Sequence, residues 1–123
     1  MRHLVVGVCL ILMLAMPAWA QTACVSETGG VLTSVLAWAD TDTTDPVGVL
    51  RGTVTGGPYT QIATAPAAAL TYTDMLTAPA SGSVSYYYVV RNQSAASGNS
   101  VNSNEACKTF FAVPTAPSNL TVK

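Results

Sequence analysis

The stretch GSVSYYYVVRN, Gly82 to Asn92, decides how this chain folds, because it is the longest run of β-forming residues in the sequence. Tyrosine and valine favour strands, and successive side chains of a strand point to opposite faces. The run divides into two faces, with Tyr86, Tyr88 and Val90 on one and Tyr87, Val89 and Arg91 on the other. Since an arginine marks the face nearer to solvent, we predict that Tyr86 and Tyr88 belong to the core and that Tyr87 faces outward.

Other β-rich segments surround this run and are separated from it by clusters of Gly, Pro, Asn, Asp and Ser. They are residues 31–40, 47–54, 59–63, 70–74 and 104–113. Only residues 64–69, TAPAAA, tolerate a helix, and that segment is too short to form a substantial one. Short strands divided by turn residues indicate an all-β chain, folded as an antiparallel sandwich or barrel.

The first twenty residues, MRHLVVGVCLILMLAMPAWA, have the pattern of a secretory signal peptide. A positive start precedes an apolar run, Pro17 breaks the helix, and Ala18 and Ala20 are the small residues that a signal peptidase reads. The alternative is a retained membrane anchor, but the apolar run is shorter than the roughly 20 residues that span a bilayer. We expect cleavage after Ala20 and a mature chain that is secreted, periplasmic or at the cell surface, without a membrane segment.

The composition of the mature chain disfavours two classes of function. Removal of residues 1–20 takes away Arg2 and the sole histidine, His3, so no basic stripe is left to neutralise the phosphates of a nucleic acid. A serine nucleophile needs an activating base, and Lys108 is the only interior lysine. The remaining carboxylates follow no catalytic motif. We therefore expect no enzyme activity, no cofactor and no nucleic-acid partner.

Two cysteines, Cys24 and Cys107, stay in the mature chain once Cys9 has left with the signal peptide. In an exported protein two cysteines most simply pair with each other. The chain-entropy account gives a loop of this length a stabilisation of roughly 4–5 kcal/mol. The alternative is two free thiols that await other partners.

An acidic segment, ADTDTTDP at residues 39–46, is a candidate for a calcium site. Asp40, Asp42 and Asp45 offer the hard oxygen ligands that Ca²⁺ prefers, but the glycine and the distal glutamate of a calcium loop are missing. Asp and Thr ahead of a proline are typical of turns and caps. We predict turn chemistry here, with calcium binding as the alternative.

The order of several motifs resembles that of a fibronectin type III domain of the kind found in secreted bacterial proteins. Leu36 and Trp38 form a leucine-x-tryptophan strand, and VGVLRGTVTGGPYTQIA at residues 47–63 is similar to a third strand, a turn and a short strand. Residues 70–106, LTYTDMLTAPASGSVSYYYVVRNQSAASGNSVNSNEA, match the rest of the pattern. The resemblance covers about residues 22–113.

This resemblance implies an immunoglobulin-like, seven-stranded antiparallel β-sandwich at residues 21–113, with strands A, B and E facing strands C, C′, F and G. It implies that Trp38 is the core tryptophan of strand B and that Val47 and Val49 point inward on strand C. It makes Tyr86 a corner tyrosine whose hydroxyl bonds to the backbone near Leu76. In this topology Cys24 and Cys107 lie at the same pole of the sandwich, where they could meet.

The last residues, 114–123, resemble the linker and first strand that open a following repeat. A hinge at residues 114–117, Pro-Thr-Ala-Pro, precedes Asn119, Leu120, Thr121 and Val122. Three interpretations remain open: a plain C-terminal extension, the remnant of a tandem array, or a tail that adds as a strand to the sheet edge of a neighbour.

Together these features predict a secreted, non-catalytic binding or spacer module that contacts a protein or a polysaccharide at or outside the cell envelope. Tyr87 and Tyr59 are the expected contact residues, because exposed aromatic rings stack on sugars or anchor protein partners. The alternative for both is a cross-strand pair within the sheet. Two other functions stay open: a structural subunit or array remnant that associates through edge strands, and a carbohydrate-binding accessory module.

Overall fold

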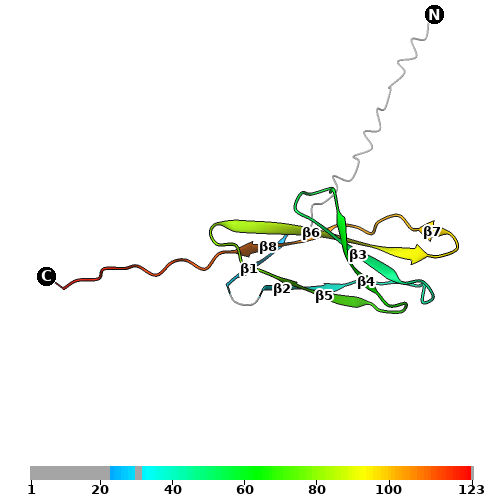
Figure 1. Cartoon of the computed structure of the whole chain (residues 1–123), viewed down its shortest axis with the longest axis horizontal. Helices are drawn as coiled ribbons and strands as arrows, with labels where there is room; N and C mark the ends of the chain where they lie inside the picture. The colour runs from blue at the N-terminus through cyan, green and yellow to red at the C-terminus, as the bar shows by residue number, and fades with distance from the viewer. Residues whose placement is uncertain (1–22, 30–31, 123) are drawn as a thin grey trace, which may run out of the picture.

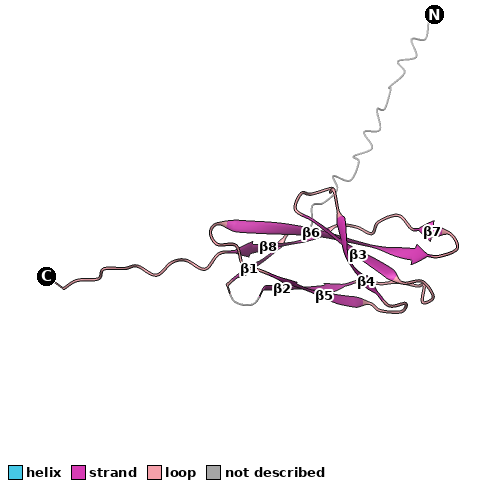
Figure 2. Cartoon of the chain, viewed as in Figure 1, coloured by secondary structure: helices cyan, strands magenta, loops and turns pink. Residues whose placement is uncertain are grey.

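The β-rich segments of the sequence all form strands in the computed structural model, which describes residues 23–29 and 32–122. The predicted signal peptide lies outside the described residues. The strands are β1 (Val25–Thr28), β2 (Leu32–Ala37), β3 (Val47–Gly52), β4 (Thr60–Ala65), β5 (Thr71–Leu76), β6 (Ser83–Ser94), β7 (Gly98–Asn99) and β8 (Ala106–Phe111). Figure 2 shows that strands and loops account for the described chain. Within this part of the chain, no helix is long and apolar enough to cross a membrane.

The strands form two sheets that face each other in a sandwich (Figure 1). The smaller sheet is the antiparallel pair of β2 and β5. The larger sheet has the order β1-β8-β6-β3-β4, and the short β7 pairs with the far end of β6. The β-sandwich predicted from the sequence is therefore confirmed.

The position of the first strand differs from the arrangement that the resemblance implies. Strand β1 does not join β2 and β5 but pairs in parallel with β8 in the larger sheet, with Val25 opposite Lys108. Cys24, just before β1, and Cys107, in β8, form a disulfide with their Cα atoms 4.7 Å apart. Because this bond holds the start of β1 against β8, the following residues continue the ladder with β8 instead of crossing to β2.

The buried side chains are not confined to one parity of each strand, because Leu50 and Val89, paired across β3 and β6, are 5% and 4% exposed. The core lies between the two sheets. Its most buried apolar members are Leu32, Val47, Val49, Tyr88 and Phe110. Val47 and Val49 come from one face of β3, as alternation requires. A register irregularity follows Val49 in the pairing of β3 with β4.

After β8 the chain leaves the sandwich as a tail that belongs to no sheet. The Ala112 amide still donates to the Gly82 carbonyl at 2.8 Å, and Figure 1 shows the chain beyond residue 113 as an extended segment running away from both layers. Proline at positions 114 and 117 favours this extended backbone. Leu120 and Val122 are 96% and 99% exposed, so the tail presents apolar side chains to solvent.

Candidate functional site

The tyrosine run of β6 contributes one side chain to a polar link between the sheets. The Tyr88 hydroxyl donates a 2.9 Å hydrogen bond to the Asp74 carboxylate on β5, in the opposite sheet. The Arg51 guanidinium on β3 donates to the same carboxylate oxygen at 2.7 Å. Asp74 is only 6% exposed, and burial raises the pKa of the Tyr88 phenol. The three residues therefore form a structural connection with little access to a substrate.

Tyr86 lies on the same face as Tyr88 but is only half-buried. Its ring contacts Phe110 edge-on, with 6.1 Å between the centroids, and the Arg51 guanidinium lies 5.0 Å from its centroid. Among the described residues, the Tyr86 hydroxyl has no hydrogen bond to the backbone near Leu76, contrary to the expectation for a corner tyrosine. It is the Tyr88 hydroxyl that is hydrogen-bonded, because the buried Asp74 carboxylate lies opposite it.

Trp38 lies just beyond the end of β2 rather than within it, and its side chain is half-buried. The Trp38 amide donates to the carbonyl of Leu70 at 3.0 Å and extends the pairing of β2 with the chain that leads into β5. Within the described chain, its buried Nε1 finds no hydrogen-bond partner. Trp38 is therefore at the end of the core.

Neither tyrosine expected to contact a partner is freely exposed. Tyr87 faces outward on β6, opposite Cys107 on one side and Gly52 on the other, and is half-buried there. The Tyr59 hydroxyl donates to the Glu105 carboxylate. Burial, followed by this bond, raises the pKa of Tyr59 to about 12. The Tyr59 hydroxyl is thus engaged within the domain, and the Tyr87 ring is half-buried on its sheet.

Glu105 is a structural residue that sequence patterns did not single out. Besides the Tyr59 hydroxyl, its carboxylate accepts hydrogen bonds from the Thr55 hydroxyl and the Gly56 amide, both at 2.8 Å. The carboxylate therefore holds the β3–β4 turn against the start of β8. Burial alone would raise the pKa of Glu105, but the hydrogen bonds from Tyr59, Gly56 and Thr55 outweigh it and lower the pKa below 4.5.

Replacement of Glu105 by glutamine (Glu105→Gln) should remove an acid-sensitive part of the stability. Because the folded state lowers this pKa, the contribution is present above about pH 4.5 and is lost as the pH falls through the lowered value. The carboxylate is near the surface, so the effect should stay within about 1 kcal/mol. Urea unfolding at a series of pH values checks this. The wild-type chain should lose more stability than the variant on acidification, and parallel curves would contradict the assignment.

The acidic residues of the loop after β2 cap their own backbone instead of converging on a common point. Asp42 accepts hydrogen bonds from the Thr44 amide at 2.9 Å and the Thr44 hydroxyl at 2.7 Å, which hold the pKa of Asp42 below 3.8. Asp40 accepts from the Asp42 amide and from the Asn92 side chain. The Asp45 amide donates a hydrogen bond to the Asp42 carboxylate. Among the described residues, no group of three or more acidic, Cys or His side chains could hold a metal ion.

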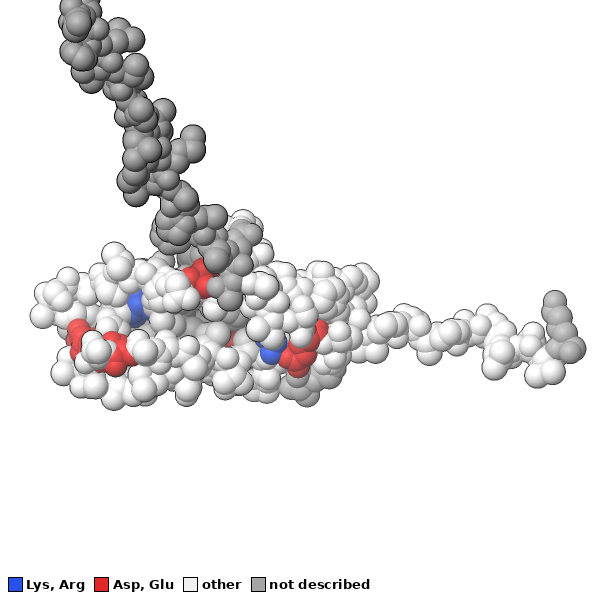
Figure 3. Space-filling view, turned by 180° about the vertical axis from the view of Figure 1, so that it is seen from behind, with Lys and Arg blue, Asp and Glu red and all other residues white. Residues whose placement is uncertain are grey.

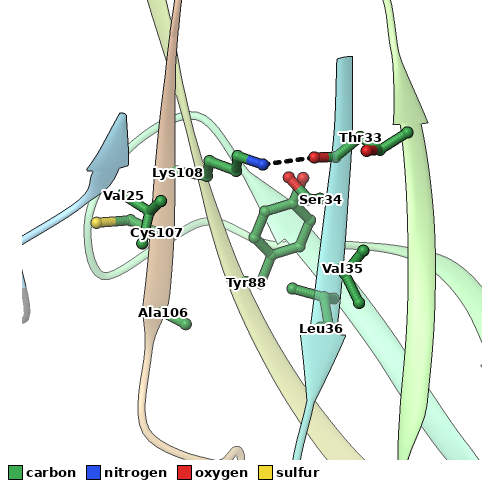
Figure 4. Close-up of a pocket in the computed structure, with 9 residues that line it drawn as sticks. All are labelled: Val25, Thr33, Ser34, Val35, Leu36, Tyr88, Ala106, Cys107 and Lys108. Carbon is green, nitrogen blue, oxygen red and sulfur yellow. Dashed lines mark hydrogen bonds between the residues drawn. The ribbon is translucent and has the colours of Figure 1, made fainter. Parts of the chain in front are cut away.

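A hollow of about 250 Å³ opens between β2 and β8 (Figure 4). It is lined by Val25, Thr33, Ser34, Val35, Leu36, Tyr88, Ala106, Cys107 and Lys108. The Lys108 ammonium crosses it to donate to the Thr33 carbonyl at 2.6 Å and pairs with the Glu27 carboxylate. The lining is mostly apolar, and its one charged group, the Lys108 ammonium, is balanced by Glu27. The hollow therefore suits an apolar side chain better than an anion.

The surface around these features carries little charge. Figure 3 shows one face of the molecule, on which scattered acidic and basic side chains interrupt a mostly uncharged surface. A surface of this kind offers no strong field for steering a charged ligand.

The solved structures that this chain resembles include that of a fibronectin-like domain. It is a crystal structure described as that of an Fn3-like protein from Clostridium thermocellum, with 31% sequence identity and a TM-score of 0.51. The match covers 73% of this chain and 94% of that one. No family model matches the sequence, and a comparison with curated proteins returns no match.

Proposed function

Because this chain belongs to the fibronectin type III-like family, whose domains are typically non-catalytic, we propose that it is a secreted binding or spacer module at the cell envelope. Its sandwich supplies a rigid body whose strands β1 and β8 are joined by a disulfide. In such a module the exposed faces and edges of the sheets make the contacts, and the interior only supports them. The partner is a protein in this proposal.

The observation that carries the proposal is the outer face of the β2–β5 sheet. The side chains of that face are Thr33, Val35, Ala37, Thr71, Thr73 and Met75, and none of them is charged. Val35 and Met75 are 69% and 73% exposed. An uncharged face with exposed apolar side chains is suited to a protein partner, since apolar residues and methionine are enriched where protein interfaces are buried.

A polysaccharide partner is less well supported. Sugar binding by a sandwich face relies on exposed aromatic rings. In the part of the chain that the structure describes, every tyrosine is half-buried or buried, and the hydroxyl of Tyr59 is already bonded to Glu105. Of the aromatic side chains that the structure describes, Phe111 is exposed, at 41%, so the carbohydrate-binding alternative rests on a single open ring.

Substitution of aspartate for Met75 (Met75→Asp) tests the proposal. The side chain is exposed, so folding should be retained, but a charge at the centre of an apolar interface should weaken partner binding at least about tenfold. The measurement is cross-linking of the purified chain to envelope proteins of its own cells, followed by titration of the captured partner. Ala95→Asp is the control. Ala95 is exposed in the turn between β6 and β7, so this substitution adds the same charge outside the β2–β5 face and should bind as the wild type does.

Two outcomes would contradict the proposal. Equal binding by the Met75→Asp and wild-type chains would exclude this face. Binding to glycans that is lost in Tyr87→Ser and retained in Met75→Asp would instead support the carbohydrate-binding alternative.

A further inference from the structure

Strand β2 has an open backbone edge, since among the described strands it pairs only with β5. Its even-numbered residues bond toward β5, as the Trp38 amide shows by donating to Leu70. The Thr33 carbonyl points the other way, because it accepts from Lys108 on β8. Backbone groups on alternate residues of a strand point to the same side, so Val35 and Ala37 also direct their amides and carbonyls toward the open edge.

A hollow lies beside this edge. The 250 Å³ space lies between β2 and β8, with apolar walls from Val25, Leu36 and Ala106. A strand added to β2 would lie over this space and direct every second side chain into it. The position is open because β1 pairs with β8 instead of β2.

We infer that the occupant of this edge is the tail of a second copy of this chain, with Leu120, Thr121 and Val122 added as a strand beside β2. Leu120 and Val122 share one face of an extended segment and are almost fully exposed. That face enters the hollow, while Thr121 points outward beside the uncharged face of Val35. Residues 113–122 carry no charge, which matches the apolar lining.

The length of the tail fits this exchange. The nine residues 114–122 span at most about 30 Å when extended, enough to reach a neighbouring molecule. Lys108 already occupies the Thr33 carbonyl, so Val35 and Ala37 are the residues whose amide and carbonyl both stay open, which matches a strand of three residues. Reciprocal exchange closes a dimer, and one-way addition builds an open chain. This inference does not depend on the protein partner proposed above.

Sedimentation velocity of the purified chain over a range of concentrations tests the exchange. We expect self-association that is weakened at least about tenfold by Leu120→Asp with Val122→Asp, because each places a charge in an apolar hollow. Asn119→Asp with Thr121→Asp adds the same charge to the other face of the tail and should associate as the wild type does. Both pairs are exposed, so neither should disturb folding.

A second variant acts on the receiving edge. Val35→Pro removes an amide that points to the open edge and leaves the ladder with β5 intact, since edge positions tolerate proline. It should abolish association. Amide exchange supplies a residue-level readout: protection of Val35 and Ala37 should rise with protein concentration, while Ser34 and Leu36, bonded to β5, should not change.

Three results would overturn the inference. The first is a chain that stays monomeric with unprotected Val35 and Ala37 amides. The second is a monomer in which these amides are protected until the tail is substituted, which means that each chain binds its own tail. The third is association that persists in Leu120→Asp with Val122→Asp, which means that another surface is responsible.

Discussion

Replacement of both cysteines (Cys24→Ser with Cys107→Ser) should lower the free energy of unfolding by about 3–5 kcal/mol. The two residues are 83 positions apart, so the disulfide removes much of the freedom of the unfolded chain. For a domain of this size such a loss corresponds to a fall in melting temperature of about 15–30 °C. Thermal and urea unfolding of the variant and the oxidised wild type give both quantities.

The reduced wild-type chain is the natural control for this variant. Its stability should fall to that of the double serine chain, while the reductant should leave the double serine chain unchanged. Amide exchange should show β1 (Val25–Thr28) released first, since β1 has only four residues and a single neighbour. If the double serine chain lost less than about 1 kcal/mol in free energy of unfolding, β1 would be held by its hydrogen bonds to β8 alone.

Asp74→Ala should be the most damaging single substitution of a polar residue, with a loss of about 2–4 kcal/mol. It leaves the buried Tyr88 hydroxyl without its acceptor and the Arg51 guanidinium without its counterion. The Arg51 side chain is 30% exposed, so water offsets part of that cost. Tyr88→Phe removes one hydrogen bond and no charge, and should cost about 1–2 kcal/mol.

A double-mutant cycle separates this network from general damage to the core. Asp74→Ala and Tyr88→Phe should be less than additive, with a coupling of about 0.5–3 kcal/mol, because both remove the same bond. Val47→Ala, in the core but outside the network, should add to either substitution. Full additivity of Asp74→Ala and Tyr88→Phe would contradict the bond between the sheets.

Local alternation was sufficient for the strands but only partly for the two faces of β6. It places Tyr88 in the core and Tyr87 on the other face, but the prediction was wrong for Val89, which shares the face of Tyr87 and is 4% exposed, and Val90, on the face of Tyr88, is only half-buried. The turn residues between segments likewise indicated a sandwich or a barrel, and the resemblance to a family decided for the sandwich. The strands and the turns depend only on neighbours in the sequence.

The contacts that sequence reasoning missed join residues far apart in the chain. Glu105 bonds to Thr55 and Tyr59 across 50 and 46 positions, and nothing in the pattern around Glu105 indicates such partners. Asp74 has the appearance of a surface carboxylate within LTYTD until the fold places Arg51 and Tyr88 against it. Such pairings follow from the packing of the sheets, which local periodicity does not specify.

The first strand shows the same limit for topology. Strand β1 is short and mostly exposed, so its hydrophobic pattern favours neither β2 nor β8 as a neighbour. The resemblance to a family supplied the expectation that it joins β2. The disulfide overrides that expectation, because Cys24 is adjacent to β1 and Cys107 lies within β8.

The same disulfide determines how the domain responds to mechanical tension. When the chain is pulled at its two ends, force enters at Cys24, passes through the covalent bond to Cys107 and leaves along β8. The residues between the two cysteines are bypassed, and the roughly 280 Å of contour length that they would release on unfolding stays locked. In an oxidising environment the domain therefore behaves as an almost inextensible link, and reduction converts it into one that can lengthen under load.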